Sequence, residues 1–186
     1  MLACEATIKV VAAALRDHNI STSVVDPVSI PACLHLHRGT NLTRDQVMVS
    51  TSGSQLLQDE ALETLIRELL PVTTILTPNF PEAQLILEKA GKKINTPQTV
   101  AEIIEVAKAV QALGPKYVLL KGGHVPLTKD RRISSMEDQH ALVYNVLCTA
   151  ERVTAFETEY INSKSTHGTG CSLACALIQK HSNIAY

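Results

Sequence analysis

The stretch LLPVTTILTPNFPEA (residues 69–83) carries, in order, the signals for a helix end, a buried strand and a new helix. Pro71 terminates a leucine-rich helical pattern, and the run at 73–76 is β-branched and apolar, as in a buried strand. A Thr-Pro-Asn turn at 77–79 closes this strand, and Pro81 suits the first turn of the helix that follows. A strand that leads directly into a helix predicts a βαβ unit in a largely parallel sheet.

The same alternation extends to both sides of this stretch. We predict helices over 5–18, with Asn19 as the stop, and over 54–70 and 81–90. A further helix is predicted to be capped by Thr96-Pro97 and stopped by Gly114-Pro115, and a last helix to start near Gly168. We predict strands over 22–26, 73–76, 116–120, 141–147 and 152–157, the last two as antiparallel neighbours. Asp26, Asn79 and Lys121 each follow a strand. Ligands bind beyond the carboxyl ends of parallel strands, so these three residues are expected at one edge.

Composition limits the class of protein and its partners. The 186 residues suit one domain, and 45% apolar with 19% charged residues is typical of a globular protein. A formal net charge of −1 gives no reason to expect nucleic acid or a membrane as partner. The five cysteines are odd in number, and their spacing contains no CxxC, which favours a reducing compartment. We therefore expect a cytoplasmic protein, and a homo-oligomer is left open.

The stretch STHGTGC (165–171) lies where the last helix is predicted to begin. A helix N-terminus exposes unpaired N–H groups and partial positive charge, and glycines let a phosphate approach the backbone. Cys171 in the first turn would then be suited to act as a base or nucleophile. The alternative is that Cys171 is a small buried residue and that the glycines only form a turn.

Five segments in this order resemble the hydroxymethylpyrimidine and phosphomethylpyrimidine kinases of thiamine biosynthesis, within the ribokinase-like superfamily. They are VVDPV (24–28), MVSTSGSQLL (48–57), residues 69–83, YVLLKGGH (117–124) and STHGTGC. The residues of these segments are most similar to those of the fungal-type enzymes. The resemblance implies a three-layer αβα fold with a mostly parallel sheet. It also implies ATP-dependent phosphorylation of hydroxymethylpyrimidine and then of its monophosphate, with ATP and Mg²⁺ as cofactors.

The resemblance also assigns roles to residues. It implies an anion hole formed by Gly168, Thr169 and Gly170, a catalytic base at Cys171, and a pyrimidine pocket that includes Val28 and Met48. It implies phosphate contacts from Lys121, Asn79 and Asp26, and Mg²⁺ ligands in Glu82 and Asp26. Such residues also have structural roles: a strand-end turn for the aspartate, a helix entry for the asparagine and a first-turn acid for the glutamate. The alternating Cys33, His35 and His37 lack a complete four-ligand zinc spacing.

The segment 29–47 interrupts the resemblance. Joining Val28 directly to Met48 restores the family pattern without a gap. We consider two explanations, a surface loop and a retained intron, because the codons from Val28 to Gln46 can carry intron-like ends. Genomic sequence with spliced transcripts distinguishes them, and an intact segment in every mature mRNA would exclude the intron.

The family chains that this sequence resembles begin earlier and end later. We therefore expect a partial kinase domain over 1–186 that lacks N-terminal units, and a chain that does not itself phosphorylate pyrimidines, since the insertion begins just after Asp26. The alternatives are a vitamin B6 or other small-metabolite kinase of the same superfamily, and a non-catalytic remnant that binds nucleotide or a partner. A cysteine hydrolase would need a base within hydrogen-bond reach of Cys171.

Overall fold

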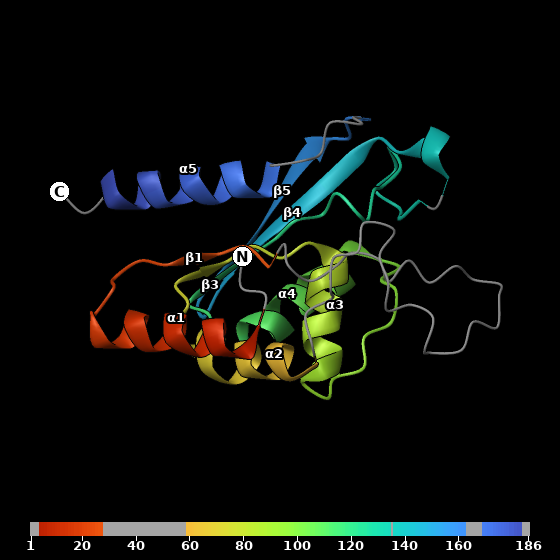
Figure 1. The fold of residues 1–186 in the computed structure, drawn as a ribbon. Helices are drawn as coiled ribbons and strands as arrows, with labels where there is room; N and C mark the ends of the chain where they lie inside the picture. The colour runs from red at the N-terminus through yellow and green to blue at the C-terminus, as the bar shows by residue number, and fades with distance from the viewer. Residues whose placement is uncertain (1–3, 28–58, 135, 163–168, 184–186) are drawn as a thin grey trace.

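A five-stranded mixed sheet carries helices on both faces (Figure 1). The computed structural model describes residues 4–27, 59–134, 136–162 and 169–183. The helices are α1 (Glu5–Asp17), α2 (Asp59–Thr64), α3 (Phe80–Lys89), α4 (Val100–Gln111) and α5 (Thr169–Asn183), with short helical turns η2 (Leu65–Leu69), η3 (Leu70–Val72) and η4 (Glu137–Gln139). The strands are β1 (Val24–Val25), β2 (Ile75–Leu76), β3 (Tyr117–Leu120), β4 (Leu142–Thr149) and β5 (Val153–Glu159).

The strands lie side by side in chain order. β1, β2 and β3 are parallel, with Val24 opposite Ile75 and Ile75 opposite Tyr117. β4 runs antiparallel to β3 and β5 antiparallel to β4. The predicted parallel arrangement is thus confirmed for the β1–β3 half, and the predicted antiparallel pair is confirmed for the other half. The short connection between β4 and β5 leaves no room for the crossover that a parallel pair requires.

The helices α1 to α4 cover one face of the sheet, and α5 lies over the other (Figure 1). This is the three-layer αβα arrangement that the sequence predicted. The core lies between the sheet and α1–α4, because the inward sides of these helices are apolar. On α4 the buried residues follow the helical period of three to four: Ile103, Val106, Ala107 and Val110. They face a sheet whose inward side chains are also buried, among them Leu76, Val118, Leu120 and Val146.

Two helix boundaries differ from the prediction. The long helix predicted over 54–70 is divided into α2, a π-type turn η2 and the 3₁₀ turn η3, and its first residues lie outside the described part of the chain. Pro71 lies in η3 and ends the helical run, as predicted. The cap of α4 is Thr99 rather than Thr96-Pro97, since the Thr99 side chain accepts a hydrogen bond from the Glu102 N–H at 3.2 Å.

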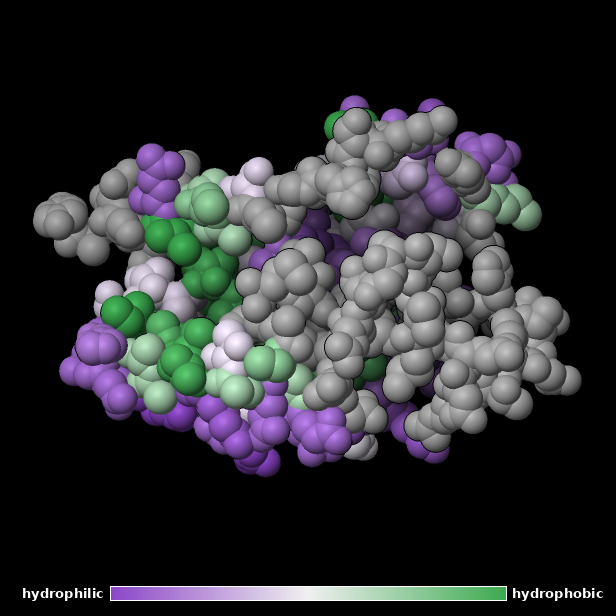
Figure 2. Space-filling model, in the orientation of Figure 1, coloured by the Kyte–Doolittle hydropathy of each residue, from purple (hydrophilic) through white to green (hydrophobic). Residues whose placement is uncertain are grey.

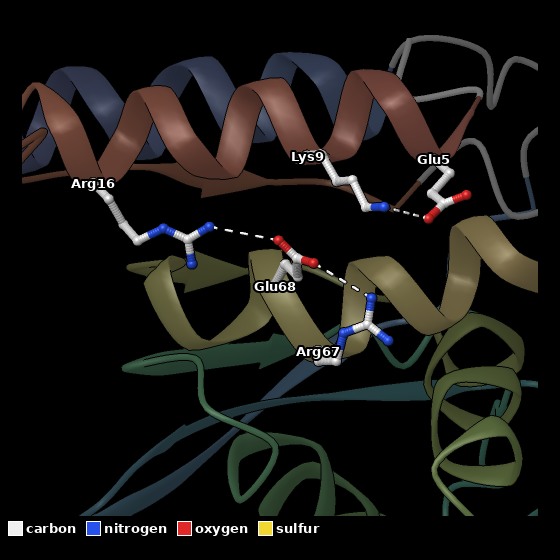
Figure 3. Close-up of polar contacts among 5 residues, drawn as sticks. All are labelled: Glu5, Lys9, Arg16, Arg67 and Glu68. Carbon is white, nitrogen blue, oxygen red and sulfur yellow. Dashed lines mark hydrogen bonds and ion pairs between the residues drawn. The ribbon is translucent and has the colours of Figure 1, made fainter.

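Apolar burial, and not ion pairing, fixes α1 in place. Ile8 and Ala12 on its inner side are fully buried. The ion pairs around it are exposed or half-buried: Glu5–Lys9 at 2.6 Å within the helix, Arg16–Glu68 at 3.6 Å to η2, and Arg67–Glu68 at 3.3 Å (Figure 3). Exposed pairs of this kind contribute little, because water screens them and long side chains lose freedom. Asn19, with a φ of 50°, ends the helical segment as predicted.

β1 is one of the two edge strands of the sheet within the described residues. Figure 2 shows hydrophobic residues gathered between α5 and α1, on the side of the molecule where β1 lies. Three apolar side chains of the neighbouring segments are exposed: Val10, Ile20 and Ile178. An edge strand has backbone groups without a sheet partner, and sheets associate most readily there. No helix in the described ranges has both the length and the hydropathy to cross a membrane.

Candidate functional site

An ion pair joins the carboxyl ends of β1 and β3 across β2. Lys121 Nζ lies 2.8 Å from Asp26 Oδ1, and the aspartate side chain is 8% exposed against 23% for the lysine. Side chains alternate along a strand, and Val25 is buried in the core between the sheet and α1–α4, so its neighbour Asp26 is placed on the opposite face. This is the face that α5 covers (Figure 1). Lys121 shares the alternation of Tyr117 and belongs to the same face. The two residues predicted from the sequence to meet at this edge are therefore in direct contact.

Two oxygens at this edge are buried without a hydrogen-bond partner among the described residues. They are Asp26 Oδ2, the carboxylate oxygen that does not bind Lys121, and Thr77 Oγ1 just after β2. A buried polar atom without a partner costs free energy. In native proteins such an atom therefore usually has a functional role or binds a water molecule or an ion. Carboxylate and hydroxyl oxygens suit a hard cation such as Mg²⁺. These two oxygens are thus of the kind that would hold a magnesium ion.

Asn79 and Glu82 form a capping box at the start of α3. The Asn79 side chain accepts a hydrogen bond from the Glu82 N–H at 2.9 Å, and the Glu82 carboxylate accepts one from the Asn79 N–H at 2.7 Å. Each interaction satisfies an N–H group that the first turn of a helix leaves unpaired. The structural role weighed from the sequence, a helix entry with a first-turn acid, is therefore present. It does not prevent the same oxygens from facing a ligand at the helix mouth.

Glu82 belongs electrostatically to the ion pair. Its side chain is buried, and burial raises the pKa of its carboxyl above the ordinary value. The hydrogen bond from the Asn79 backbone and the nearby Lys121 charge act to lower this pKa, while the Asp26 charge raises it. Two carboxylates and one ammonium thus lie within range of one another. A divalent cation would relieve the repulsion between the two carboxylates.

We expect Glu82→Gln to be at least as stable as the parent chain at neutral pH in the absence of divalent metal. A carboxyl whose pKa is raised in the folded state stabilises the fold below its unfolded pKa, and this contribution is lost as pH rises through the folded value. Glutamine keeps an oxygen for the Asn79 N–H and avoids burying a charge. Urea unfolding from pH 4 to 8 in EDTA should give a flatter profile for the variant. A variant less stable than the parent at pH 8 would contradict the assignment.

The chain turns sharply after Lys121, and a residue not predicted from the sequence supports the turn. The Lys121 N–H donates to the Pro78 carbonyl at 2.8 Å, and the Gly122 N–H donates to Asn145 Oδ1 at 3.1 Å. A Cβ on Gly122 would lie 1.9 Å from the Tyr144 carbonyl oxygen. Asn145 lies in β4, where the sequence pattern predicts only a strand. Its role could not be found without knowing which residue of β4 faces the turn.

The start of α5 agrees with the predicted helix mouth. The helix begins at Thr169, so Thr169, Gly170 and Cys171 occupy its first turn, on the sheet face to which Asp26 and Lys121 belong. Four predicted features lie outside the described residues: Gly168, Val28 and Met48, the segment 29–47, and the residues Cys33, His35 and His37 within it. Within the described ranges, no three His, Cys, Asp or Glu side chains are grouped as a metal site.

Solved structures with this arrangement are small-molecule kinases. A Bacillus subtilis pyridoxal kinase solved as an ADP complex matches with a TM-score of 0.62 and 26% identity, over 94% of this chain and 52% of that one. A Clostridium difficile phosphomethylpyrimidine kinase matches with a TM-score of 0.54 and 26% identity, over 97% of this chain and 66% of that one. The fold is thus that of the ribokinase-like class of kinases.

The particular family follows from the sequence comparison. The phosphomethylpyrimidine kinase family model matches residues 29–184, and the chain belongs to this family. A putative hydroxymethylpyrimidine/phosphomethylpyrimidine kinase of Schizosaccharomyces pombe is 34% identical over 177 residues, which is 95% of this chain and 28% of that protein. The Salmonella typhimurium hydroxymethylpyrimidine/phosphomethylpyrimidine kinase is 35% identical over 84% of this chain and 51% of its own length. The chain therefore spans about half, or less, of the length of these curated relatives.

Proposed function

We propose that this chain carries the ATP- and phosphate-binding part of a kinase that phosphorylates hydroxymethylpyrimidine and then its monophosphate. The observation that carries the proposal is the ion pair between Lys121 and Asp26, with an unpartnered buried oxygen on Asp26, at the carboxyl ends of parallel strands. Open α/β sheets bind ligands at this edge. Phosphoryl transfer requires mainly positioning and charge stabilisation, which a cationic side chain and a carboxylate-held metal supply.

In this proposal each residue at the edge has a defined partner. The Lys121 ammonium binds phosphate oxygens of ATP, and the Asn79 amide at the mouth of α3 faces the same phosphates. Asp26 and Glu82 hold Mg²⁺ through their carboxylates. The two groups are close enough for the Asp26 charge to raise the pKa of the Glu82 carboxyl. When bound, the magnesium ion would neutralise phosphate charge. Its selection over larger cations rests on the small number of carboxylates at the edge.

The first turn of α5 completes the proposed site. The backbone N–H groups of Gly168, Thr169 and Gly170 form the anion hole for the transferring phosphoryl group, because a helix N-terminus favours negative charge. Cys171, as the thiolate, removes the proton from the acceptor hydroxyl as its oxygen bonds to the γ-phosphorus of ATP, and the bond from this phosphorus to the leaving ADP oxygen breaks. Val28 and Met48 contribute to the pyrimidine pocket. The protein is proposed to act in the cytoplasm, without nucleic acid as a partner, and a homo-oligomer remains open.

Calorimetric titration of the chain with the non-hydrolysable analogue AMP-PCP and Mg²⁺ tests the nucleotide part of the proposal. We expect saturable binding that Lys121→Met weakens by at least tenfold, since a hydrogen bond to a charged group contributes about 1.5–3 kcal/mol. Lys92→Met is the matched control, because Lys92 is an exposed lysine outside the site. Absence of nucleotide binding, or equal affinities of the two variants, would contradict the assignment of the edge.

A second titration adds hydroxymethylpyrimidine or pyridoxal to the nucleotide-saturated chain and shows which of them is the acceptor. The alternative is a pyridoxal kinase, favoured by the TM-score of 0.62 to the Bacillus subtilis enzyme against 0.54 to the Clostridium difficile one. Family membership favours hydroxymethylpyrimidine over pyridoxal. A preference for pyridoxal would support the alternative. We also expect that this chain releases no ADP in response to pyrimidine, since the segment 29–47 begins three residues after Asp26.

Protection from alkylation tests the position of Cys171. If its thiol faces the phosphoryl group, bound AMP-PCP and Mg²⁺ should slow its reaction with iodoacetamide severalfold. Cys175, one turn further along α5, and Cys4 are exposed and serve as internal controls in the same sample. Their rates should not change with nucleotide. Equal rates at Cys171 with and without saturating nucleotide, measured by mass spectrometry, would place this thiol away from the phosphates.

A further inference from the structure

We infer that Asn145 is a positioning residue for Lys121, which it controls through the turn at Gly122. The inference concerns how the lysine is held in place, and it rests on the proposed function only for the ligand that the lysine binds. Asn145 lies in β4 and has no contact with Asp26 among the hydrogen bonds of the described residues. Its side chain acts on the backbone that carries the ammonium group.

The argument begins where β3 separates from β4. The pairing of the two strands ends at Leu120 opposite Val146. At the next residue the chain turns toward the other neighbour, because Lys121 forms a bridge with Asn79 and donates its N–H to the Pro78 carbonyl. Continued pairing would have placed Lys121 opposite Asn145. The Asn145 side chain therefore occupies the place where the backbone pairing stops.

The asparagine satisfies the first backbone donor beyond the lysine. Gly122 is buried, and its N–H donates to Asn145 Oδ1 at 3.1 Å. On the same side the glycine contacts the β4 backbone so closely that a Cβ would lie 1.9 Å from the Tyr144 carbonyl oxygen. The turn is thus held by a close backbone contact and by one side-chain acceptor. Of these two supports, only the acceptor can be removed without adding atoms.

Loss of the acceptor should move Lys121. A buried N–H without a partner costs free energy, so the Gly122 amide would shift toward water or another carbonyl. The lysine Cα is directly bonded into this turn, and its ammonium reaches Asp26 by extending over β2. A small rotation of the turn would lengthen the 2.8 Å contact and expose the ammonium, whose side chain is now only 23% exposed.

Lysine acetylation followed by mass spectrometry tests the inference without relying on any ligand. In the wild-type chain, Lys121 should react more slowly than the exposed lysines Lys92 and Lys93, which are measured in the same digest. We expect Asn145→Ala to accelerate acetylation of Lys121 by about five- to tenfold, the factor that corresponds to one lost hydrogen bond. An unchanged Lys121 rate in a folded Asn145→Ala chain would overturn the inference.

Further variants separate positioning from a general loss of stability. Leu147→Ala removes packing from the same face of the same strand, two residues away, and should lower the melting temperature without changing the Lys121 rate. Asn145→Asp keeps an oxygen for the Gly122 N–H and should retain slow acetylation. If Asn145→Ala does not fold, Asn145→Ser, whose hydroxyl is too short to reach the amide, is expected to show the same acceleration. Equal acceleration in Leu147→Ala would also overturn the inference.

Nucleotide affinity is measured on the same variants as a separate readout. If the chain binds AMP-PCP and Mg²⁺, Asn145→Ala should weaken binding about five- to tenfold while Leu147→Ala leaves it unchanged. Equal affinities of the two variants would overturn the inference. If the wild-type chain binds no nucleotide, the proposed function fails, and the acetylation rates alone decide whether Asn145 positions Lys121.

Discussion

Gly122→Ala is expected to destabilise the protein by about 3 kcal/mol, toward the upper end of what overpacking costs. The added methyl carbon would lie 1.9 Å from the Tyr144 carbonyl oxygen and 2.7 Å from the carbonyl carbon. Both atoms belong to the backbone of β4, where Tyr144 is paired with Glu157 of β5, so they cannot move away as a flexible side chain could. Domains of this kind are stable by only about 5–15 kcal/mol, so the loss is a large fraction of the total.

Urea unfolding followed by circular dichroism measures this effect, and the neighbouring glycine supplies the control. A Cβ on Gly123 meets nothing within 4 Å, so Gly123→Ala should change stability by less than about 0.5 kcal/mol. The two variants make the same chemical change at adjacent positions. Equal stability of the two variants would contradict the close contact between the turn and β4. The proposed positioning role of Asn145 would then lose its geometric basis.

Asp26→Ala is expected to cost about 2–3 kcal/mol of stability. Removing one partner of a buried ion pair typically costs about 3–5 kcal/mol, because the other charge remains in a site shielded from water. The Lys121 side chain is 23% exposed and can reach solvent in part, so we expect a smaller value here. The substitution also removes a buried carboxylate oxygen that has no partner within the described residues, which offsets some of the loss.

The exposed pair in α1 provides the matched comparison for Asp26. Glu5 and Lys9 approach to 2.6 Å, closer than Lys121 and Asp26, yet both side chains are more than 40% exposed (Figure 3). Glu5→Ala should therefore leave the urea midpoint nearly unchanged. Comparison of Asp26→Ala with Glu5→Ala would then show that burial, and not distance, determines the contribution of an ion pair to stability. A midpoint shift for Glu5→Ala as large as that for Asp26→Ala would contradict this explanation.

Addition of Mg²⁺ should stabilise the parent chain but not the Asp26→Ala chain. If the carboxylates of Asp26 and Glu82 hold the ion, millimolar Mg²⁺ raises the urea midpoint of the parent, since a ligand that binds only the folded state stabilises it. The variant, with one carboxylate removed, should show no such rise.

The local elements could be predicted from the sequence because their signals lie within a few residues. Pro71 ends a helical run wherever it occurs, since it has no N–H to donate. Asn79 and Glu82 are three residues apart, which is the spacing of a capping box, and their contact follows from the helix itself. Asp26, Asn79 and Lys121 each follow a segment predicted to be a strand, so their common edge was predictable.

The boundaries of weak elements were less predictable. No residue type in the run signals the change from α2 to the π-type turn η2, whose Leu65 and Leu69 are buried in the core. Thr96 and Thr99 are equally good caps by composition. The choice of Thr99 depends on where the chain approaches α4 after the irregular segment at 92–97.

Only the tertiary structure decided which distant residues meet. Lys121 and Asp26 are separated by 95 positions in the chain, and Gly122 and Asn145 by 23. The sequence of β4 indicates a strand, but it does not indicate that pairing with β3 stops at Val146 and leaves the next side chain to accept a backbone N–H. Strand register arises from the summed packing of both sheet faces, so no short motif encodes it. For this reason Asp26 and Lys121 could be expected at one edge from the sequence, whereas the hydrogen bond from Gly122 to Asn145 appeared only in the fold.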